Sequence, residues 1–352
     1  MNKKLLKSLL ATVAVISAPV LCYGQTSWNT TTGAWNVGGN WTSGVPSGGA
    51  GETVTIATDG AVVNLTTVSA SRSLTVSGNG TATPILNITN TLNNNFSIFS
   101  VGSIATGSNY SGTVNHTAGA VTIGGGSGTR RLNIAASATG TNSGNSGTYN
   151  FGGAVGTSLL VQSEVRIANR AGETGLLSLS DIGSFTASSD LDLNLSGGGN
   201  ATLAVSGGGL SISANRLQLS VANSNVGMAS LNATFTSTGF STINVTNGVV
   251  FDNTLSLTNN TAFNLTLNGF TGIVGQKITV INAGAAFTGF GAFGNVADGS
   301  TITSGGYQFL ADYDNTLHDF TLEVTVIPEP SALALMVASL CVLVILRRRR
   351  MA

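Results

Sequence analysis

The sequence predicts an all-β fold, and three observations lead to that prediction. Gly (47), Ser (39), Thr (45) and Asn (34) make up 165 of the 352 residues, whereas only 8% of the residues are charged. Short runs that alternate apolar and polar residues recur from residue 25 to residue 326, separated by clusters of Gly, Asn and Ser. Related runs return at spacings of 26 to 35 residues, which is typical of coils stacked into a β-solenoid. A pair of β-sandwiches is the alternative architecture.

Composition and charge exclude several classes of protein. An apolar fraction of 42% argues against disorder, and the scarcity of Lys, Glu and Gln argues against alternating α/β folds. Seven of the fourteen basic residues lie in the first seven or the last six positions, whereas all fourteen acidic residues lie between Glu52 and Glu329. The part of the chain between its ends is therefore acidic. Nucleic acid, which needs a basic surface, is not an expected partner.

Residues 1–24 are predicted to be a secretory signal peptide, read by the general secretion machinery. A basic start precedes the apolar run from Leu9 to Cys22, and the small Gly24 stands before Gln25 at the expected cleavage point. A transmembrane helix is the alternative, but Pro19 and the shortness of the run disfavour it. Leu21, which precedes Cys22, is larger than the small residue usual at a lipidation site, and this disfavours a lipid anchor.

Residues 25–60 are predicted to form an N-terminal cap, because they hold all three tryptophans, Trp28, Trp35 and Trp41. The first coil of a stack has no neighbour on one side, and large aromatic rings would cover that open end. Exposed tryptophans also stack on sugars, so a carbohydrate contact is the alternative role. The stretch from Trp35 to Ile56 resembles the opening segment of secreted solenoids related to autotransporter-associated β-strand repeats, which implies a solenoid body.

Residues 61–306 are predicted to form the repeated coils. Ser111-Gly-Thr-Val-Asn-His-Thr-Ala-Gly-Ala-Val resembles Ser146-Gly-Thr-Tyr-Asn-Phe-Gly-Gly-Ala-Val, which starts 35 residues later. Weaker copies start near Gly175, Ala201 and Ala229. In such a stack, inward Val, Ile and Leu would form one long core, Asn or Thr would form ladders at the corners, and Gly-Gly-Gly runs at 124–126, 197–199 and 207–209 would supply positive φ angles.

Residues 307–326 are predicted to form a terminal β-hairpin that closes the other end of the stack. Two alternating runs, Tyr307–Tyr313 and Phe320–Val326, flank a turn at Asp314-Asn315. The preceding stretch from residue 284 to residue 294 is rich in Gly, Ala and Phe. It is predicted to be a loop that packs its phenylalanines on the hairpin.

Residues 327–352 are predicted to be a C-terminal targeting segment that contains a membrane helix. Pro328, Glu329 and Pro330 precede 16 apolar residues, 331–346, and then four arginines, Arg347, Arg348, Arg349 and Arg350. A helix of that length spans about 24 Å, slightly less than a bilayer core of about 30 Å, and snorkelling arginines help to close the gap. The basic cluster is expected to stay in the cytoplasm.

These three parts in this order resemble the PEP-CTERM sorting signal. The resemblance covers about 26 residues, and a plain single-pass anchor is the alternative. It implies that an exosortase, a membrane-embedded cysteine protease, recognises the tripeptide and removes the tail. It also implies transient inner-membrane anchoring in a Gram-negative-type cell, followed by release to the cell surface or the extracellular matrix.

Sequence reasoning identifies no catalytic, cofactor or metal site. Both cysteines, Cys22 and Cys341, lie in the terminal apolar segments. His116 and His318 are about 200 residues apart, too far in sequence to suggest a metal pair, and each is expected at the surface or at a corner. No Gly-x-Ser-x-Gly motif followed by a helix is present.

The remaining charged residues are also expected to be structural. Asp190-Leu-Asp192 places two carboxylates on one strand face, as does Asp312-Tyr-Asp314, and a solvated face is the preferred interpretation. Four arginines appear too sparse for an anion groove; they are Arg130, Arg131, Arg166 and Arg170.

The expected function is therefore that of an exported, non-catalytic structural or adhesive protein at the surface or in the matrix, where it contacts extracellular polysaccharide through many weak hydrogen bonds. The alternative is a polysaccharide-active β-helix enzyme, a lyase or a hydrolase. Such an enzyme would need acids, basic residues and aromatics clustered on one face.

Overall fold

A computed structural model describes residues 25–47, 52–67, 70–103, 109–124, 130–136, 144–194, 198–220, 227–251 and 259–328, and residue 347. The predicted signal peptide, the residues 329–346 and the last three arginines lie outside these ranges. Within the ranges, no helix is long and apolar enough to cross a membrane.

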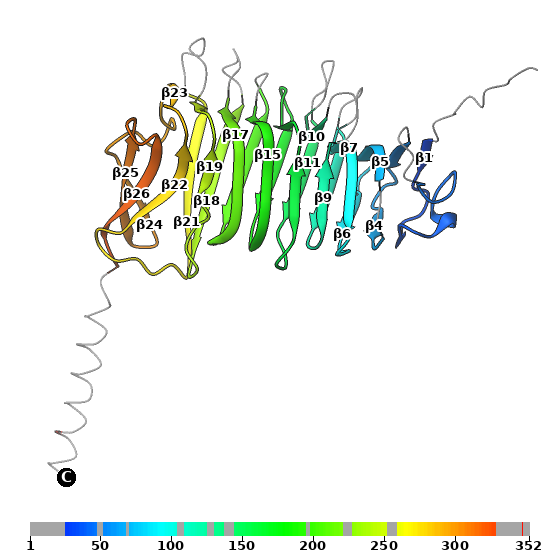
Figure 1. Cartoon of the computed structure of the whole chain (residues 1–352), viewed down its shortest axis with the longest axis horizontal. Helices are drawn as coiled ribbons and strands as arrows, with labels where there is room; N and C mark the ends of the chain where they lie inside the picture. Colours follow the sequence, from blue (N-terminus) through cyan, green and yellow to red (C-terminus); the bar gives the residue numbers. More distant parts are fainter. Residues whose placement is uncertain are drawn as a thin grey trace, which may run out of the picture.

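The described chain is all-β, as predicted, and its strands stack side by side along the long axis of the molecule (Figure 1). They form a nine-stranded sheet and a seventeen-stranded sheet, here the small sheet and the large sheet. One short 3-10 helix, Gly38–Asn40, lies near the N-terminal end. These large parallel sheets are consistent with a β-solenoid.

The small sheet takes one strand from each successive coil, and all its pairings are parallel. Inward and outward side chains alternate along most of its strands, as the burial of the four-residue strands shows. Its strands are β2 (Thr32–Ala34), β4 (Val62–Leu65), β6 (Ile85–Ile88), β8 (Ser111–His116), β11 (Ser146–Phe151), β14 (Thr174–Leu179), β16 (Asn200–Ser206), β18 (Met228–Thr236) and β21 (Thr261–Asn268).

The large sheet carries two columns of strands along most of its length, because single long strands pair with two short ones. Strand β7 pairs with both β9 and β10, and β17 pairs with both β19 and β20. A register shift between Ala187 and Asp190 divides the long strand β15 between the columns. The parallel strands are β1 (Gln25–Ser27), β3 (Thr53–Ile56), β5 (Ala70–Val76), β7 (Asn93–Val101), β9 (Ala120–Ile123), β10 (Arg131–Ile134), β12 (Ser158–Val161), β13 (Glu164–Ile167), β15 (Ile182–Leu193), β17 (Gly209–Leu219), β19 (Ile243–Val245), β20 (Val249–Phe251), β22 (Lys277–Ala283) and β23 (Thr288–Gly289).

The register of the small sheet confirms the predicted repeat. Ser111 lies opposite Ser146, the start of the copy that begins 35 residues later. Gly175 then lies opposite Gly147 on one side and Ala201 on the other, and Ala201 lies opposite Ala229. Coils of different length therefore start at the same level, and loops of variable length absorb the difference.

Every coil in the middle of the stack turns the same corner with a residue in the left-handed region. These residues directly follow the second column of the large sheet, and they are Gly102, Ala135, Ala168, Asn194 and Ser220, with φ between 46° and 65°. Their amides continue the ladder, as in the bond from the Ala168 N to the Ile134 carbonyl, 2.9 Å. Of the predicted Gly-Gly-Gly corners, Gly198 and Gly207 do have positive φ.

The glycines of the two Ser-Gly-Thr copies, Gly112 and Gly147, pack against this corner, where there is no room for a side chain. A Cβ at Gly147 would lie 2.4 Å from the Val101 carbonyl oxygen and 2.5 Å from the Ala135 nitrogen. The glycine of the Ser-Gly-Thr repeat is therefore required by the close approach of the two sheets.

The N-terminal end of the stack is covered by its own chain. Segment 41–44 runs along the free edge of β1, where the Thr42 N donates to the Ser27 carbonyl (2.9 Å) and the Ser43 hydroxyl to the Gln25 carbonyl (3.2 Å). The backbone groups of the first strand are therefore not left open to another chain.

An antiparallel extension ends the stack at the other side: β24 (Thr301–Ser304), β25 (Tyr307–Asp314) and β26 (Asp319–Val326). Strand β26 pairs antiparallel with β22, so the predicted hairpin joins the large sheet directly. The edge of the small sheet is covered by side chains: both amide atoms of Asn295 bond the backbone of Phe263, each at 2.9 Å. As predicted, Phe287 and Phe293 pack on this extension, whereas Phe290 is exposed.

Candidate functional site: a charged ladder across four coils

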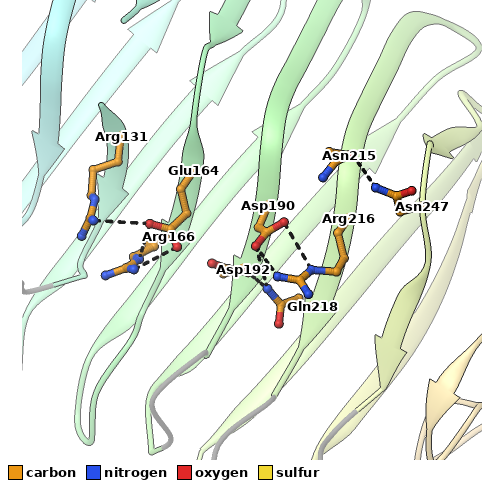
Figure 2. A network of polar contacts seen from close by, with 9 residues as sticks. All are labelled: Arg131, Glu164, Arg166, Asp190, Asp192, Asn215, Arg216, Gln218 and Asn247. Atoms are coloured by element: carbon orange, nitrogen blue, oxygen red, sulfur yellow. Dashed lines mark hydrogen bonds and ion pairs between the residues drawn. The ribbon is translucent and has the colours of Figure 1, made fainter. Parts of the chain in front are cut away.

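Charged and polar side chains from four neighbouring strands gather on the outer face of the large sheet (Figure 2). The strands are β10, β13, β15 and β17, and each contributes residues that alternate with buried leucine, valine or isoleucine. The register places Arg131 opposite Glu164, Arg166 opposite Asp192, and Asp190 opposite Arg216. We call this cluster the charged ladder: Arg131, Glu164, Arg166, Asp190, Asp192, Arg216 and Gln218.

The contacts within the charged ladder link successive coils. Within β13, Arg166 Nη2 donates to Glu164 Oε1 at 2.9 Å, and Arg166 Nε lies 2.9 Å from Oε2 as an ion pair. Across the coils, Glu164 Oε2 lies 3.6 Å from Arg131 Nη2. The guanidinium of Arg216 binds both carboxylate oxygens of Asp190, with Nε to Oδ1 at 3.3 Å. Because the arginines are held by the acids, few of their charges are free for a ligand.

Asp192 is the most buried member of the charged ladder, with an exposed fraction of 1%. Gln218 Nε2 donates to its Oδ1 at 2.8 Å, and the Glu164 carboxyl group of the preceding coil is its neighbour. Burial, together with the hydrogen bond and negative charge of Glu164, raises the pKa of Asp192 to about 8. Asp192 is therefore largely protonated at neutral pH.

The pKa of Glu164 is lowered despite its partial burial, because the hydrogen bonds and charges of Arg166 and the neighbouring groups favour its ionised form. The two carboxyl groups thus share one proton between adjacent coils. What the arrangement does chemically is hold a proton in a buried inter-coil bond.

The neighbourhood of the charged ladder offers little for gripping a ligand. The outward residues of the flanking strands are Ile98 and Ser100 on one side and Val250 on the other, none of them aromatic. In the part of the chain that the structure covers, no group of three or more His, Cys, Asp or Glu could hold a metal ion.

Sequence reasoning missed this cluster, in which stacking brings Arg131, Arg166 and Arg216 onto one face. One of its expectations here is wrong. Asp192 is not on a solvated face, because neighbouring coils cover it. An alignment of the second strand of each coil would have placed Arg131 level with Glu164, and Asp190 level with Arg216.

His116 is also misplaced by the sequence interpretation, since it is fully buried and not at the surface. Its ring packs edge-on against Phe151, with centroids 5.1 Å apart, and its two nitrogens contact the Tyr149 hydroxyl (3.2 Å) and the Gly119 carbonyl (3.1 Å). Burial lowers its pKa to about 4, so it is neutral. His318, by contrast, lies in the turn before β26 with φ of 56°, as expected for a corner residue.

The three predicted cap tryptophans lie together at the N-terminal end. Trp41 stands edge-on to both Trp28 (centroids 4.9 Å apart) and Trp35 (4.8 Å), and its Nε1 donates to the Trp35 carbonyl at 2.7 Å. All three are at most 3% exposed. Rings buried in this way present no open face on which a sugar could stack.

The residues predicted for export and sorting lie at the limits of the described chain. Gln25 is the first residue of β1, and Pro328 follows the last strand after one residue. Arg347 is exposed. Gly24, Glu329, Pro330, Arg348, Arg349 and Arg350 lie outside the described residues.

No protein-family model matches the sequence, and the searches of curated proteins and of solved structures likewise find no match.

Proposed function

We propose that this protein is an exported, non-catalytic structural or adhesive rod, a β-solenoid that acts at the cell surface or in the extracellular matrix of a Gram-negative-type cell. The observation that carries the proposal is the in-register stack of coils with both ends covered. Such a body is stiff without disulfides, and covered ends keep it from adding further strands. A stiff body with long uniform faces suits many weak contacts to extracellular polysaccharide.

The two ends of the sequence support export and sorting. The signal peptide directs the chain through the general secretion machinery, and the Pro328-Glu329-Pro330 tail holds it transiently in the inner membrane, where an exosortase removes the tail. The body ends at Val326, so the tripeptide follows the last strand after a single residue.

Mass spectrometry of the mature protein tests this proposal. We expect an N-terminus at or near Gln25 and loss of all residues after the tripeptide. The matched variant Glu329→Ala should retain the tail and stay with the membrane fraction. A mature wild-type protein that still carries residues 331–352 would refute exosortase sorting.

The charged ladder gives a second candidate function, that of a polysaccharide-active enzyme, because it holds three carboxyl groups and three arginines on one face. If it acted so, Asp192 would be the acid and Glu164 the base. Release of new reducing ends or unsaturated sugars from polysaccharide by the wild type, abolished in both Asp192→Asn and Glu164→Gln, would replace the structural proposal. Equal, background-level release by all three proteins would dismiss the enzyme.

A further inference from the structure

An asparagine ladder runs along the outside of the small sheet. Each amide donates through Nδ2 to Oδ1 of the asparagine one coil earlier, in the order Asn150 to Asn115 to Asn87 to Asn64, and all three bonds are 2.9 Å long. After an interruption at Ser178 and Ala204, the column resumes with Asn264 donating to Asn232 at 2.8 Å. We call this outer surface of the small sheet the amide face.

A second column of the amide face lies two residues before the first. In it, Thr113 is level with Thr148, Thr202 is level with Ser230, and the apolar Ile85 and Leu176 occupy the same level in neighbouring coils. These outward side chains are half-buried, and threonine is stiff at χ1. The face is therefore a fixed array of hydroxyl, methyl and amide groups spaced at the strand repeat of about 4.8 Å.

The amide face carries no charge. The nine strands of the small sheet contain no Asp, Glu, Lys or Arg, and His116 points into the core. Asn87 and Asn115 each use one N–H and one lone pair for their neighbours in the ladder, so one donor and one acceptor of each remain for a ligand. That combination complements sugar hydroxyl groups, which both donate and accept.

We propose that the amide face binds an extended neutral polysaccharide laid along the long axis of the stack. The absence of charge matches a neutral glycan and gives no attraction for a uronic acid polymer. Because the side chains are already ordered by the ladder, little entropy is lost on binding, and contacts repeated from coil to coil add up. The inference deepens the proposed adhesive role and depends on it.

Co-sedimentation of the full-length protein with cellulose, a neutral extended glucan, tests the proposal, with alginate as the acidic comparison. We expect binding to cellulose that changes little between low and high NaCl. The triple variant Thr113→Val, Thr148→Val and Thr202→Val keeps shape and β-propensity but removes three hydroxyls, and should weaken binding about tenfold or more. Filling the gap in the ladder with Ser178→Asn and Ala204→Asn should tighten it.

A matched control removes three outward threonines from the large sheet instead: Thr75→Val, Thr122→Val and Thr186→Val. This control should bind like the wild type. Equal losses in both triple variants, no loss in either, or preference for alginate would overturn the amide face as the site. Processing of the two termini is measured separately by mass spectrometry. Absence of glycan binding would therefore contradict the amide-face proposal without contradicting the sorting proposal.

Discussion

The amide face and the charged ladder are built by the same stacking of coils, yet they satisfy their polar groups in different ways. On the amide face, identical asparagines repeat, and an amide can both donate to one neighbour and accept from the next. A charged column cannot repeat one residue, because like charges repel. It must alternate acids and bases, and where Glu164 meets Asp192 two acids fall side by side, so a proton is retained. Uniform repetition thus gives a neutral surface, and irregular repetition gives a titratable one.

The largest expected effect is a loss of stability at alkaline pH, which comes from the charged ladder. The pKa of Asp192 is raised in the folded state to about 8, above its unfolded value near 3.9. Its contribution to stability is therefore fully present below about pH 4 and is lost as pH rises through 8, a change on the order of 5 kcal/mol. Asp192→Asn keeps a donor towards Glu164 at every pH and should lack this loss.

Urea denaturation of both proteins at pH 4, 6 and 9 measures the effect. The two free energies of unfolding should be similar at pH 4 and should diverge in favour of Asp192→Asn by pH 9. Parallel profiles would show that Asp192 does not hold a proton in the fold, and the distinction drawn between the two faces would lose its basis.

Low pH should destabilise the interior beneath the amide face. Burial lowers the pKa of His116 to about 4 from 6.5, so its contribution to stability is present above pH 6.5 and is lost as pH falls towards 4. The expected loss is about 3 kcal/mol. The double variant His116→Leu and Tyr149→Phe removes the titrating ring and its hydroxyl partner together, and should flatten the acid side of the profile. An unchanged acid slope in that variant would assign the loss to other groups.

The close approach of the two sheets can be broken at one glycine. Gly147→Ala puts a Cβ against the Val101 carbonyl, and we expect a loss of about 2 kcal/mol in the free energy of unfolding. Ala201 occupies the same level two coils later, so the restriction is local. Gly39→Ala, whose Cβ would meet nothing within 4 Å, is the control and should change stability by less than about 0.5 kcal/mol. Equal effects in both variants would refute the steric explanation.

Sequence reasoning succeeds on the small sheet because its motif is repeated there. Ser-Gly-Thr fixes where each coil begins, and the predicted copies at Gly175, Ala201 and Ala229 are the residues that face one another. The period of two along this strand also predicts the direction of the His116 side chain. Val114 is a core residue, so the side chain two positions later points inward as well.

The charged ladder could not be found in the same way. The loops before the second column vary in length, and Arg131 and Glu164 stand 33 residues apart, so that only an alignment of the short runs 131–135 and 164–168 brings them level. Burial of Asp192 was equally hidden, because it depends on side chains from adjacent coils rather than on its own strand. Asparagine ladders were predicted for corners. The pair Asn247 and Asn215 is not at a corner, because Asn215 lies within β17, and the longest ladder runs along the small sheet.

The salt dependence of stability should differ between the two faces. This is the smallest of the expected effects and the most specific. Asn115→Ala removes two amide bonds of 2.9 Å and should cost about 1 to 2 kcal/mol at any NaCl concentration, because the bonds join neutral groups. Arg216→Gln removes an ion pair whose arginine is 44% exposed, and should cost less than about 1 kcal/mol in low salt and almost nothing in 1 M NaCl. Thermal unfolding of both variants in low and high salt gives the comparison. A salt-dependent loss in Asn115→Ala would mean that the amide face is held by charge after all, since a ladder of neutral amides has nothing for salt to screen.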